Sequence, residues 1–504
     1  MNERVADISK IPTGIEGFDF LASGGLPVGR TTLVSGTAGS AKTVFAVQFL
    51  AEGIRKFDQP GVFLTFEETP GDIRLNMASL GWDIAAFEKA GKWLFVDAAP
   101  QPGEESVVTG TYDLGALLAR IEHAVTRISA QRVAVDSLGA IFTQFADANL
   151  VRGELFRIGS ALKQMGVTAV MTAERTEEYG EISRYGVEEF VTDNVIILRN
   201  VLESQKRRRT MEILKFRGTL HHKGEYPFTV MPGEGIIAIP LAAIQLKQKS
   251  SYVRISSGTT ELDRMCGGGF FRDSIILVSG ATGCGKTLLT TEFIGGGATQ
   301  GERCLLFAFE ESRDQLFRNA SGWGKDFAAM EDAGLLQVIS VYPETASLED
   351  HLISMKSAIQ TFKPNRVAVD SLSALERVST SKGFREFVIG LTSFIKHQEV
   401  GGMFTATTPG LMGGESVTEA HISTITASII LLRYVEMFGE MRCGLTVLKM
   451  RGSMHDKEIR EFTIDGHGMH IHQPFRNVTG ILSGQPRHVT RDEVERMGGM
   501  FQED

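Results

Sequence analysis

The chain of 504 residues has a formal net charge of −9 and a pI near 5.8, which argues against a dedicated nucleic-acid binder. Its four cysteines show no pair spacing of a zinc site or disulfide framework, so we expect a reducing, cytoplasmic location. The first ten residues are polar and mixed in charge, unlike a signal peptide, and the longest apolar run, 235–244, is too short to span a bilayer. We therefore expect no membrane association.

In chain order, the first strong pattern is the glycine-rich run GTAGSAKT at 36–43, which leads into a predicted helix. Apolar runs that predict strands then alternate with helical periodicity. The strands are 61–66, 94–96, 133–135 and 168–172, and the helices include 114–128 and 154–165. Two further strands between 195 and 216 are predicted to flank a basic turn, Lys206–Arg209. Nearly all-apolar strands between helices, closed by a β meander, predict a mainly parallel α/β sheet of the RecA-like type.

The second half of the chain repeats the first. The run GATGCGKT at 280–287 lies 244 residues after GTAGSAKT, since 286 − 42 and 287 − 43 are both 244. A period near half the chain length indicates two copies of one domain rather than a solenoid. We therefore predict two tandem RecA-like P-loop domains, 1–246 and 247–504, joined by a short polar connector near 247–251.

Each glycine-rich run stands between an apolar strand and a helix, which is the context of a phosphate-binding loop. Backbone N–H groups and the positive end of the helix would surround the phosphates of ATP, and the lysine would reach the β- and γ-phosphates. The predicted nucleotide-binding residues are Gly36, Thr37, Ala38, Gly39, Ser40, Ala41, Lys42 and Thr43, and Gly280, Ala281, Thr282, Gly283, Cys284, Gly285, Lys286 and Thr287.

Magnesium held with ATP needs a loop hydroxyl and a carboxylate at a strand end. Asp136 and Asp370 end the matched strands RVAVD, so the predicted metal ligands are Thr43, Asp136, Thr287 and Asp370. A strand-end aspartate is also common for structural reasons, but its recurrence in both halves favours the metal role.

Adjacent glutamates end the strand that follows each loop helix, Glu67–Glu68 and Glu310–Glu311. They are the candidate catalytic groups for hydrolysis or for deprotonating a hydroxyl. Neighbours on a strand point to opposite faces, so we expect one of each pair to do the chemistry, and the sequence does not choose between them. The competing interpretation is a solvated strand end.

Two cations lie two residues apart in a matched Leu-Lys-x-Arg-Gly run near the end of each half. They are Lys215 and Arg217, and Lys449 and Arg451. On a strand they face the same side, where they could stabilise charge on the nucleotide of an adjacent subunit. A solvated edge strand is the alternative.

The two halves differ at two places. Ala41 occupies the position of Gly285 before the loop lysine, where a methyl group restricts the backbone. Ser423 and Thr424 align, at an offset of 234, with Glu189 and Phe190. Only the second half therefore offers hydroxyls as a phosphoryl acceptor at this position.

The duplicated loops, the runs FEET and FEES, KFRG and KMRG, and above all EAHISTITASIILL at 419–432 followed by MRGSMHDKEIREF at 450–462, resemble KaiC. This is the family of autophosphorylating ATPases of cyanobacterial-type circadian clocks and their bacterial relatives. The similarity runs from Thr13 to about Val489. It implies a homohexamer of two stacked rings with ATP between subunits, a slow ATPase ring from the first half, and a serine/threonine autokinase ring from the second.

The resemblance also implies roles for single residues. Ser423 and Thr424 match the phosphorylated pair, Thr418 matches a nearby hydroxyl, and the four glutamates match catalytic residues. Residues that match contacts to the neighbour's nucleotide are Lys215, Phe216, Arg217, Thr219 and His221, and Lys449, Met450, Arg451, Ser453, His455 and Lys457. Ser79 and Trp323 match further nucleotide contacts.

Several positions depart from the family pattern. Ala41 replaces the usual glycine, and Met454 stands where the clock protein has a tryptophan near the base. The tail after Val489 departs from the KaiA-docking segment, which argues against a KaiA partner. A KaiB-like partner is compatible with the resemblance, although no residue indicates it.

Two other hypotheses stay open. A RecA-like motor acting on DNA would use the shared core and the run Lys206–Arg209, although the acidic composition makes nucleic acid a poor fit. A nucleotide-gated assembly scaffold would form rings without kinase activity. The favoured hypothesis is an ATP-dependent ring protein that hydrolyses ATP and phosphorylates itself, as a clock or signalling timer.

Overall fold

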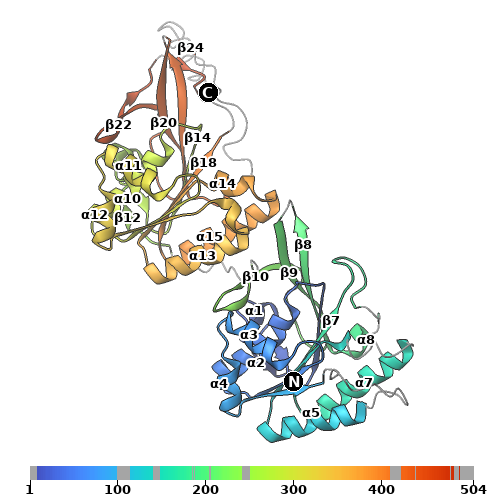
Figure 1. The fold of residues 1–504 in the computed structure, drawn as a ribbon. Coiled ribbons are helices and arrows are strands. Elements are labelled where there is room, and N and C mark those ends of the chain that lie inside the picture. The colour runs from blue at the N-terminus through green and yellow to red at the C-terminus, as the bar shows by residue number, and fades with distance from the viewer. Residues whose placement is uncertain are drawn as a thin grey trace, which may run out of the picture. The chain divides into compact units, whose positions relative to one another are not determined.

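The computed structural model describes residues 8–98, 114–139, 148–183, 186, 188–203, 206–240, 250–408, 422–437, 439–476, 478–481 and 487–488. The chain divides into two compact units, Met1–Ala243 and Ile244–Asp504 (Figure 1). The predicted boundary between residues 246 and 247 lies outside the described residues and stays a prediction. Each unit is built on a nine-stranded sheet of the described residues, and the sheets share one strand arrangement.

In the first domain the sheet order is β11-β10-β9-β8-β3-β7-β6-β4-β5. Its parallel strands are β3 (Thr31–Gly36), β4 (Gly61–Thr65), β5 (Trp93–Asp97), β6 (Arg132–Asp136), β7 (Thr168–Glu174) and β8 (Asn194–Glu203). The antiparallel meander is β9 (Lys206–Phe216), β10 (Glu225–Met231) and β11 (Gly235–Ala238). The helices are α1 (Phe18–Leu21), α2 (Lys42–Phe57), α3 (Pro70–Ala78), α4 (Ile84–Lys89), α5 (Leu114–Ile128), α7 (Ala148–Gln164) and α8 (Glu188–Val191), and β1 (Lys10–Ile11) pairs with β2 (Leu26–Pro27).

Two apolar cores lie on opposite faces of this sheet, because alternate strand residues point to opposite sides. Val34 of β3 belongs to the core that includes Phe45 and Phe49 of α2. Its neighbour Leu33 belongs to the core that includes Ile121 of α5 and other residues of α5 and α7. The phosphate-loop helix therefore covers one face and helices α5 and α7 cover the other (Figure 1).

The second domain repeats this arrangement in the order β16-β15-β17-β18-β14-β19-β20-β21-β22. Its strands are β14 (Ile275–Gly280), β15 (Cys304–Ala308), β16 (Leu336–Ser340), β17 (Arg366–Asp370), β18 (Gly401–Thr407), β19 (Ser428–Met437), β20 (Glu440–Met450), β21 (Arg460–Asp465) and β22 (Gly468–Pro474). The helices are α9 (Thr260–Met265), α10 (Lys286–Thr299), α11 (Arg313–Gly322), α12 (Phe327–Asp332), α13 (Leu348–Phe362), α14 (Leu372–Arg377) and α15 (Ser381–His397), with 3-10 turns η2 (Pro343–Thr345) and η3 (Ile422–Thr424). Two short pairs complete it, β12 (Arg254–Ile255) with β13 (Phe270–Phe271), and β23 (Val478–Thr479) with β24 (Arg487–His488).

These two domains confirm the predicted α/β class of tandem RecA-like folds. One local prediction was wrong: the basic run Lys206–Arg209 begins strand β9 and does not form a turn. Its arginines contact the same chain, since Arg207 donates to the Asn200 carbonyl at 2.8 Å and Arg209 donates to the Gly39 carbonyl at 3.3 Å. Among the described residues, no helix is both long and apolar enough to cross a membrane.

Candidate nucleotide sites

The first glycine-rich run forms a loop between β3, which ends at Gly36, and α2, which begins at Lys42. The Lys42 ammonium donates to the Thr37 carbonyl at 3.0 Å and so closes over the loop. Burial lowers the pKa of Lys42, while nearby carboxylates, Glu174 first, act in the opposite direction. A polyphosphate in the loop would supply the negative charge that favours the charged lysine.

The second loop, between β14 and α10, has the same form. Lys286 is 8% exposed, and its ammonium donates to the carbonyls of Gly280 at 3.0 Å and Ala281 at 2.8 Å. Tyr434 of β19 donates to the Thr282 carbonyl at 3.4 Å. A Cβ at Gly283 would lie 2.9 Å from the Tyr434 hydroxyl, so glycine is needed for this close approach.

The residue before each loop lysine adopts a left-handed backbone conformation. Gly285 has φ 94° and Ala41 has φ 71°. This conformation costs a residue with a Cβ about 1–2 kcal/mol. The first loop therefore keeps the shape of the second at the expense of backbone strain at Ala41.

The hydroxyl and carboxylate predicted as metal ligands lie together in both domains. Thr43 Oγ1 donates to Asp136 at 2.7 Å, and Thr287 likewise hydrogen-bonds Asp370. A threonine from the neighbouring strand also donates to each aspartate, Thr172 to Asp136 and Thr405 to Asp370. Burial raises the pKa of Asp370, and its threonine hydrogen bonds oppose that shift.

This donor set fits magnesium, which takes one or two protein oxygens and completes its shell with phosphate and water. Among the described residues, no three His, Cys, Asp or Glu side chains gather into an all-protein metal cage. Thr43 with Asp136, and Thr287 with Asp370, are therefore the groups that could hold magnesium beside a nucleotide.

The two glutamates of each pair have different partners. Glu67 and Glu310 accept hydrogen bonds from Ser137 at 3.0 Å and Ser371 at 3.1 Å, and each serine directly follows the aspartate that is hydrogen-bonded to the loop threonine. Arg377 of α14 also donates to Glu310. The first glutamate of each pair is thus fixed against the strand that ends in the aspartate.

The second glutamate of each pair turns toward the following helix. Asn76 donates to Glu68 at 3.2 Å and Asn319 donates to Glu311 at 3.0 Å. Burial first, and then the charge of Asp136 or Asp370, raises the pKa of both Glu68 and Glu311. A raised pKa brings a carboxylate closer to the range of a proton acceptor.

The cation pairs contact the segment in which the two halves differ. Arg451 donates to the Thr424 carbonyl at 2.8 Å, and Lys449 donates to that of Thr426 at 3.0 Å. Arg217 contacts the Phe190 carbonyl at 3.4 Å in the first domain. Since 451 − 217 and 424 − 190 are both 234, this contact confirms the alignment of Thr424 with Phe190.

The turn η3, which bears the hydroxyls, and the phosphate loop lie at opposite ends of the parallel strands of one sheet. The side on which these strands begin is called the amino edge, and the side on which they end is called the carboxyl edge. Strand β19 runs parallel to β14, with Ser428 beside Ile276 and Leu432 beside Gly280. The loop follows Gly280 at the carboxyl edge, whereas Thr424 precedes Ser428 at the amino edge. The four steps along β14 alone separate them by about 13 Å. Thr424 is exposed there.

Other predicted nucleotide contacts lie at the same amino edge or near the loops. Phe216 and Met450 are buried in their own domain cores, so their side chains do not face outward. Burial lowers the pKa of His221. Ser453 accepts a hydrogen bond from Arg254 at 2.7 Å.

The remaining predicted residues are more open. Thr219 is half-buried, as is His455, and Lys457 is exposed. Ser79 is exposed at the end of α3, and half-buried Trp323 ends α11. The side chain of Ser423 and the whole of Thr418 lie outside the described residues.

Sequence reasoning missed the residues that orient the aspartates and glutamates. These are the threonines of β7 and β18, the asparagines of α3 and α11, and Glu178, which accepts from Thr37 at 2.6 Å. A signal was present, because Asn76 and Asn319 are separated by 243 residues, and Thr172 and Thr405 by 233, close to the repeat period.

Each domain combines a mainly parallel sheet with a glycine-rich loop, a paired threonine and aspartate, and glutamates at the end of a nearby strand. These features define the RecA-like class of P-loop nucleotide-binding proteins. Comparison with known proteins narrows the class. The family model described as the KaiC ATPase matches residues 11–243 and again 255–475. The chain belongs to the KaiC family.

Several curated relatives span nearly the full chain or all of it. The circadian clock protein KaiC3 of Synechocystis sp. is 68% identical over 503 residues, which is 100% of this chain and 99% of that protein. The circadian clock oscillator protein KaiC of Thermostichus vulcanus is 57% identical and that of Synechococcus elongatus is 56% identical, each over 97% of this chain and 94% of its own length.

Proposed function

We propose that the protein binds magnesium-ATP in both domains, hydrolyses it, and uses ATP in the second domain to phosphorylate Ser423 and Thr424 of a neighbouring copy. It would act as a cytoplasmic clock or signalling timer, as the names of its relatives suggest. The observation that carries the proposal is the position of the hydroxyl-bearing turn at the edge of the sheet opposite the phosphate loop of the same chain.

This separation requires two copies for phosphoryl transfer. The four steps along β14 alone put about 13 Å between the phosphate loop and the turn that carries Thr424 in the same chain, far beyond the contact of about 3–3.5 Å that reaction needs. A head-to-tail neighbour can place its amino edge against the loop, and repetition of such a contact closes a ring. The KaiC resemblance supports a homohexamer as the form of that ring.

The cation pairs support the same arrangement. Lys449 and Arg451 lie beside Thr424 at the amino edge, so they would reach the neighbour's nucleotide together with the acceptor. Lys215 and Arg217 lie at the matched edge of the first domain, where Glu189 and Phe190 take the positions of the hydroxyl pair. The first domain is thus equipped for hydrolysis and the second for transfer to protein.

In the transfer step, the acceptor hydroxyl oxygen bonds to the γ-phosphorus while the bond from that phosphorus to the β–γ bridging oxygen breaks, releasing ADP. The hydroxyl proton goes to a carboxylate of the Glu310–Glu311 pair. Lys286 holds the phosphates, and Thr287 and Asp370 would position magnesium, which supplies charge neutralisation. Water replaces the hydroxyl at Glu67–Glu68 in the first domain.

Mixing two variants tests the proposal. Lys286→Ala removes the donor site, and the Ser423→Ala, Thr424→Ala double variant removes the acceptor. We expect neither to incorporate labelled phosphate alone at these residues, whereas a co-assembled mixture labels the Lys286→Ala chains on Ser423 and Thr424. A mixture that stays unlabelled while wild-type chains are labelled contradicts transfer between copies.

Two controls separate the alternatives. Wild-type chains that form rings with ATP but incorporate no label would be a scaffold. ATP hydrolysis that rises several-fold with single-stranded DNA would indicate a DNA motor, against which the contacts of Arg207 and Arg209 within the chain argue. We expect DNA to leave the rate of ATP hydrolysis unchanged. A KaiB-like partner is compatible with the family, and the tail after Val489 argues against a KaiA partner.

A further inference from the structure

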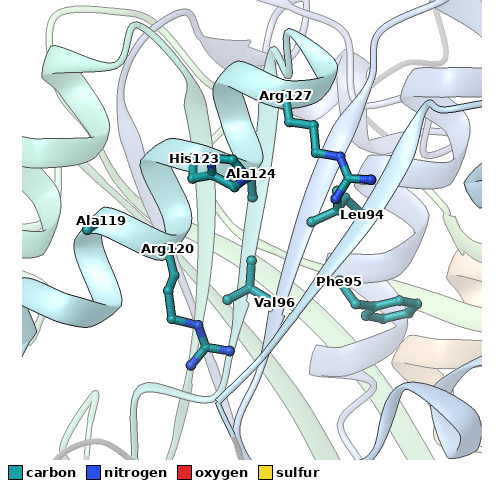
Figure 2. Close-up of a pocket in the computed structure, with 8 residues that line it drawn as sticks. All are labelled: Leu94, Phe95, Val96, Ala119, Arg120, His123, Ala124 and Arg127. Carbon is teal, nitrogen blue, oxygen red and sulfur yellow. The ribbon is translucent and has the colours of Figure 1, made fainter.

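A groove follows the edge of the first domain's sheet, between strand β5 and helix α5, with a volume of about 350 Å³ (Figure 2). The order of the strands puts β7, β6 and β4 between β5 and the phosphate-loop strand β3. At about 4.8 Å per strand spacing, the groove is about 19 Å from that strand. It is therefore separate from the first nucleotide site.

The groove has an apolar floor and a basic wall. Leu94 and Val96 of β5, with Ala124 of α5, form the floor. Arg120 and Arg127 reach from the helix toward the strand in Figure 2. His123 lies between them on the same helical face, because residues three and seven apart share a face.

The basic wall is unusual in a chain with net charge −9. Arg120, His123 and Arg127 are exposed, and the ion pairs between described residues include none made by the two arginines. Arg120 instead donates to the backbone carbonyl of Asp97, at the end of β5. The groove thus concentrates positive charge next to an apolar floor.

Strand β5 is the last strand of the sheet order, so within the described residues its outer side pairs with no strand. An open strand edge presents backbone donors and acceptors to another extended chain. Addition of a peptide strand to such an edge, with alternate side chains entering adjacent pockets, is a general mode of recognition. The five residues of β5 offer about 16 Å of such an edge.

The second domain lacks the basic wall. Helix α13 has the same 15-residue length as α5 and follows it at an offset of 234. At the matched positions Arg120, His123 and Arg127 are replaced by neutral hydroxyl residues. These are Ser354, Ser357 and Thr361. The RecA-like fold therefore does not require the cations, and their presence in one copy calls for a separate explanation.

We propose that this groove docks an extended acidic segment of a partner protein, which adds a strand to β5, points its acidic side chains toward α5 and points its apolar side chains to the opposite face of the sheet. Arg120 and Arg127 are about 10.5 Å apart along the helix axis. Alternate residues of an extended chain are about 6.6 Å apart, so acidic side chains on one face of the segment come within reach of all three basic groups. Charge complementarity selects the acidic occupant.

Fluorescence anisotropy with the full-length protein tests the proposal. The probe is a fluorescein-labelled peptide of eight residues that alternates glutamate and valine, and its matched control alternates lysine and valine. We expect saturable binding of the acidic peptide and none of the basic one. The Arg120→Ser, His123→Ser, Arg127→Thr variant installs the second domain's residues and should weaken binding about tenfold, from the loss of two exposed arginine charge pairs and of the His123 side-chain contact.

Backbone pairing is tested with N-methylated peptides. Methylation of the amides that would face β5 should abolish binding, while methylation of the alternate amides should preserve it. Binding that is unaffected by the triple substitution, or equal for both methylated peptides, overturns the proposal. An unchanged thermal unfolding temperature confirms that the triple variant is folded. If the oligomer mass of this variant drops in the absence of peptide, a second copy of the chain occupies the groove, and this result also overturns the proposal.

Discussion

Substitution of Gly285 by alanine tests whether the second phosphate loop needs a glycine for its backbone shape. Gly285 has φ 94°, farther from the left-handed minimum near +57° than the 71° of Ala41. An added Cβ would also lie 3.3 Å from Ile464 Cδ1, which is tighter than ordinary contact. The substitution therefore combines backbone strain with side-chain crowding.

The magnitude follows from two opposing effects. A Cβ in the left-handed region costs about 1–2 kcal/mol, while loss of glycine's freedom in the unfolded chain returns about 0.4–1 kcal/mol. We expect a net destabilisation of about 1 kcal/mol, with the contact to Ile464 acting in the same direction. That corresponds to about a fivefold fall in the protection of the loop helix against local opening.

Hydrogen exchange of α10 amides, read by mass spectrometry on nucleotide-free protein, measures this effect for one domain without assuming a two-state transition. The reciprocal variant Ala41→Gly is the matched control. It should raise protection of α2 by a smaller factor, because the Ala41 methyl group packs against the first domain's core. Equal protection of α10 in wild-type and Gly285→Ala protein would refute the argument from backbone strain.

Three further predictions concern the site. Thr43→Ala should raise the magnesium concentration needed for half-maximal ATP binding at least about tenfold, by removing one of two ligands; unchanged magnesium titration by calorimetry would contradict it. Glu311→Gln should abolish the labelling of Ser423 and Thr424 with phosphate. The same substitution should raise the unfolding temperature of nucleotide-free protein, because the raised pKa of Glu311 means that its charged form is disfavoured in the fold. This gain should shrink as pH falls through the folded pKa toward the ordinary glutamate value, and a gain that persists at low pH would exclude the charge as its cause. Arg451→Ala should lower labelling of Thr424 more than Arg217→Ala does, since Arg451 holds the Thr424 carbonyl; equal labelling in both variants would remove that role.

The fold could be predicted from the sequence because the patterns that specify its strands and phosphate loops are local and occur in both halves of the chain. The strand Arg132–Asp136 is apolar between its first arginine and its final carboxylate, and its counterpart Arg366–Asp370 has the same five residues. A parallel strand covered on both faces must have this composition, so its position could be read directly. The loop lysines and threonines followed from the same spacing argument.

Other features depended on tertiary structure. The run Lys206–Arg209 resembled a turn because four adjacent charges interrupt any apolar alternation, yet it pairs with Asn200–Glu203 of β8. All four of these pairs lie beyond Leu198↔Met211, where burial of the hairpin decreases and apolar side chains are not required. The partners of each glutamate were likewise hidden, since they come from a different strand or helix.

The position of the acceptor turn shows most clearly what pattern alone cannot give. Ser423 and Thr424 were recognised by comparing the halves, but their distance from Lys286 depends on β19 lying beside β14, which is set by strand order. That adjacency places the hydroxyls and the loop at opposite edges, so the proposed transfer would need a second copy of the chain. Both domains keep the loop, the aspartate, the glutamates and the cation pair, so a ring contact that completes one nucleotide site would complete the other. Under the proposed function, the differences between the domains would assign hydrolysis to the first domain and transfer to protein to the second. If both proposals hold, the exposed basic groove of the first domain binds a partner, and Ser423 and Thr424 of the second domain carry the phosphate to which that partner responds.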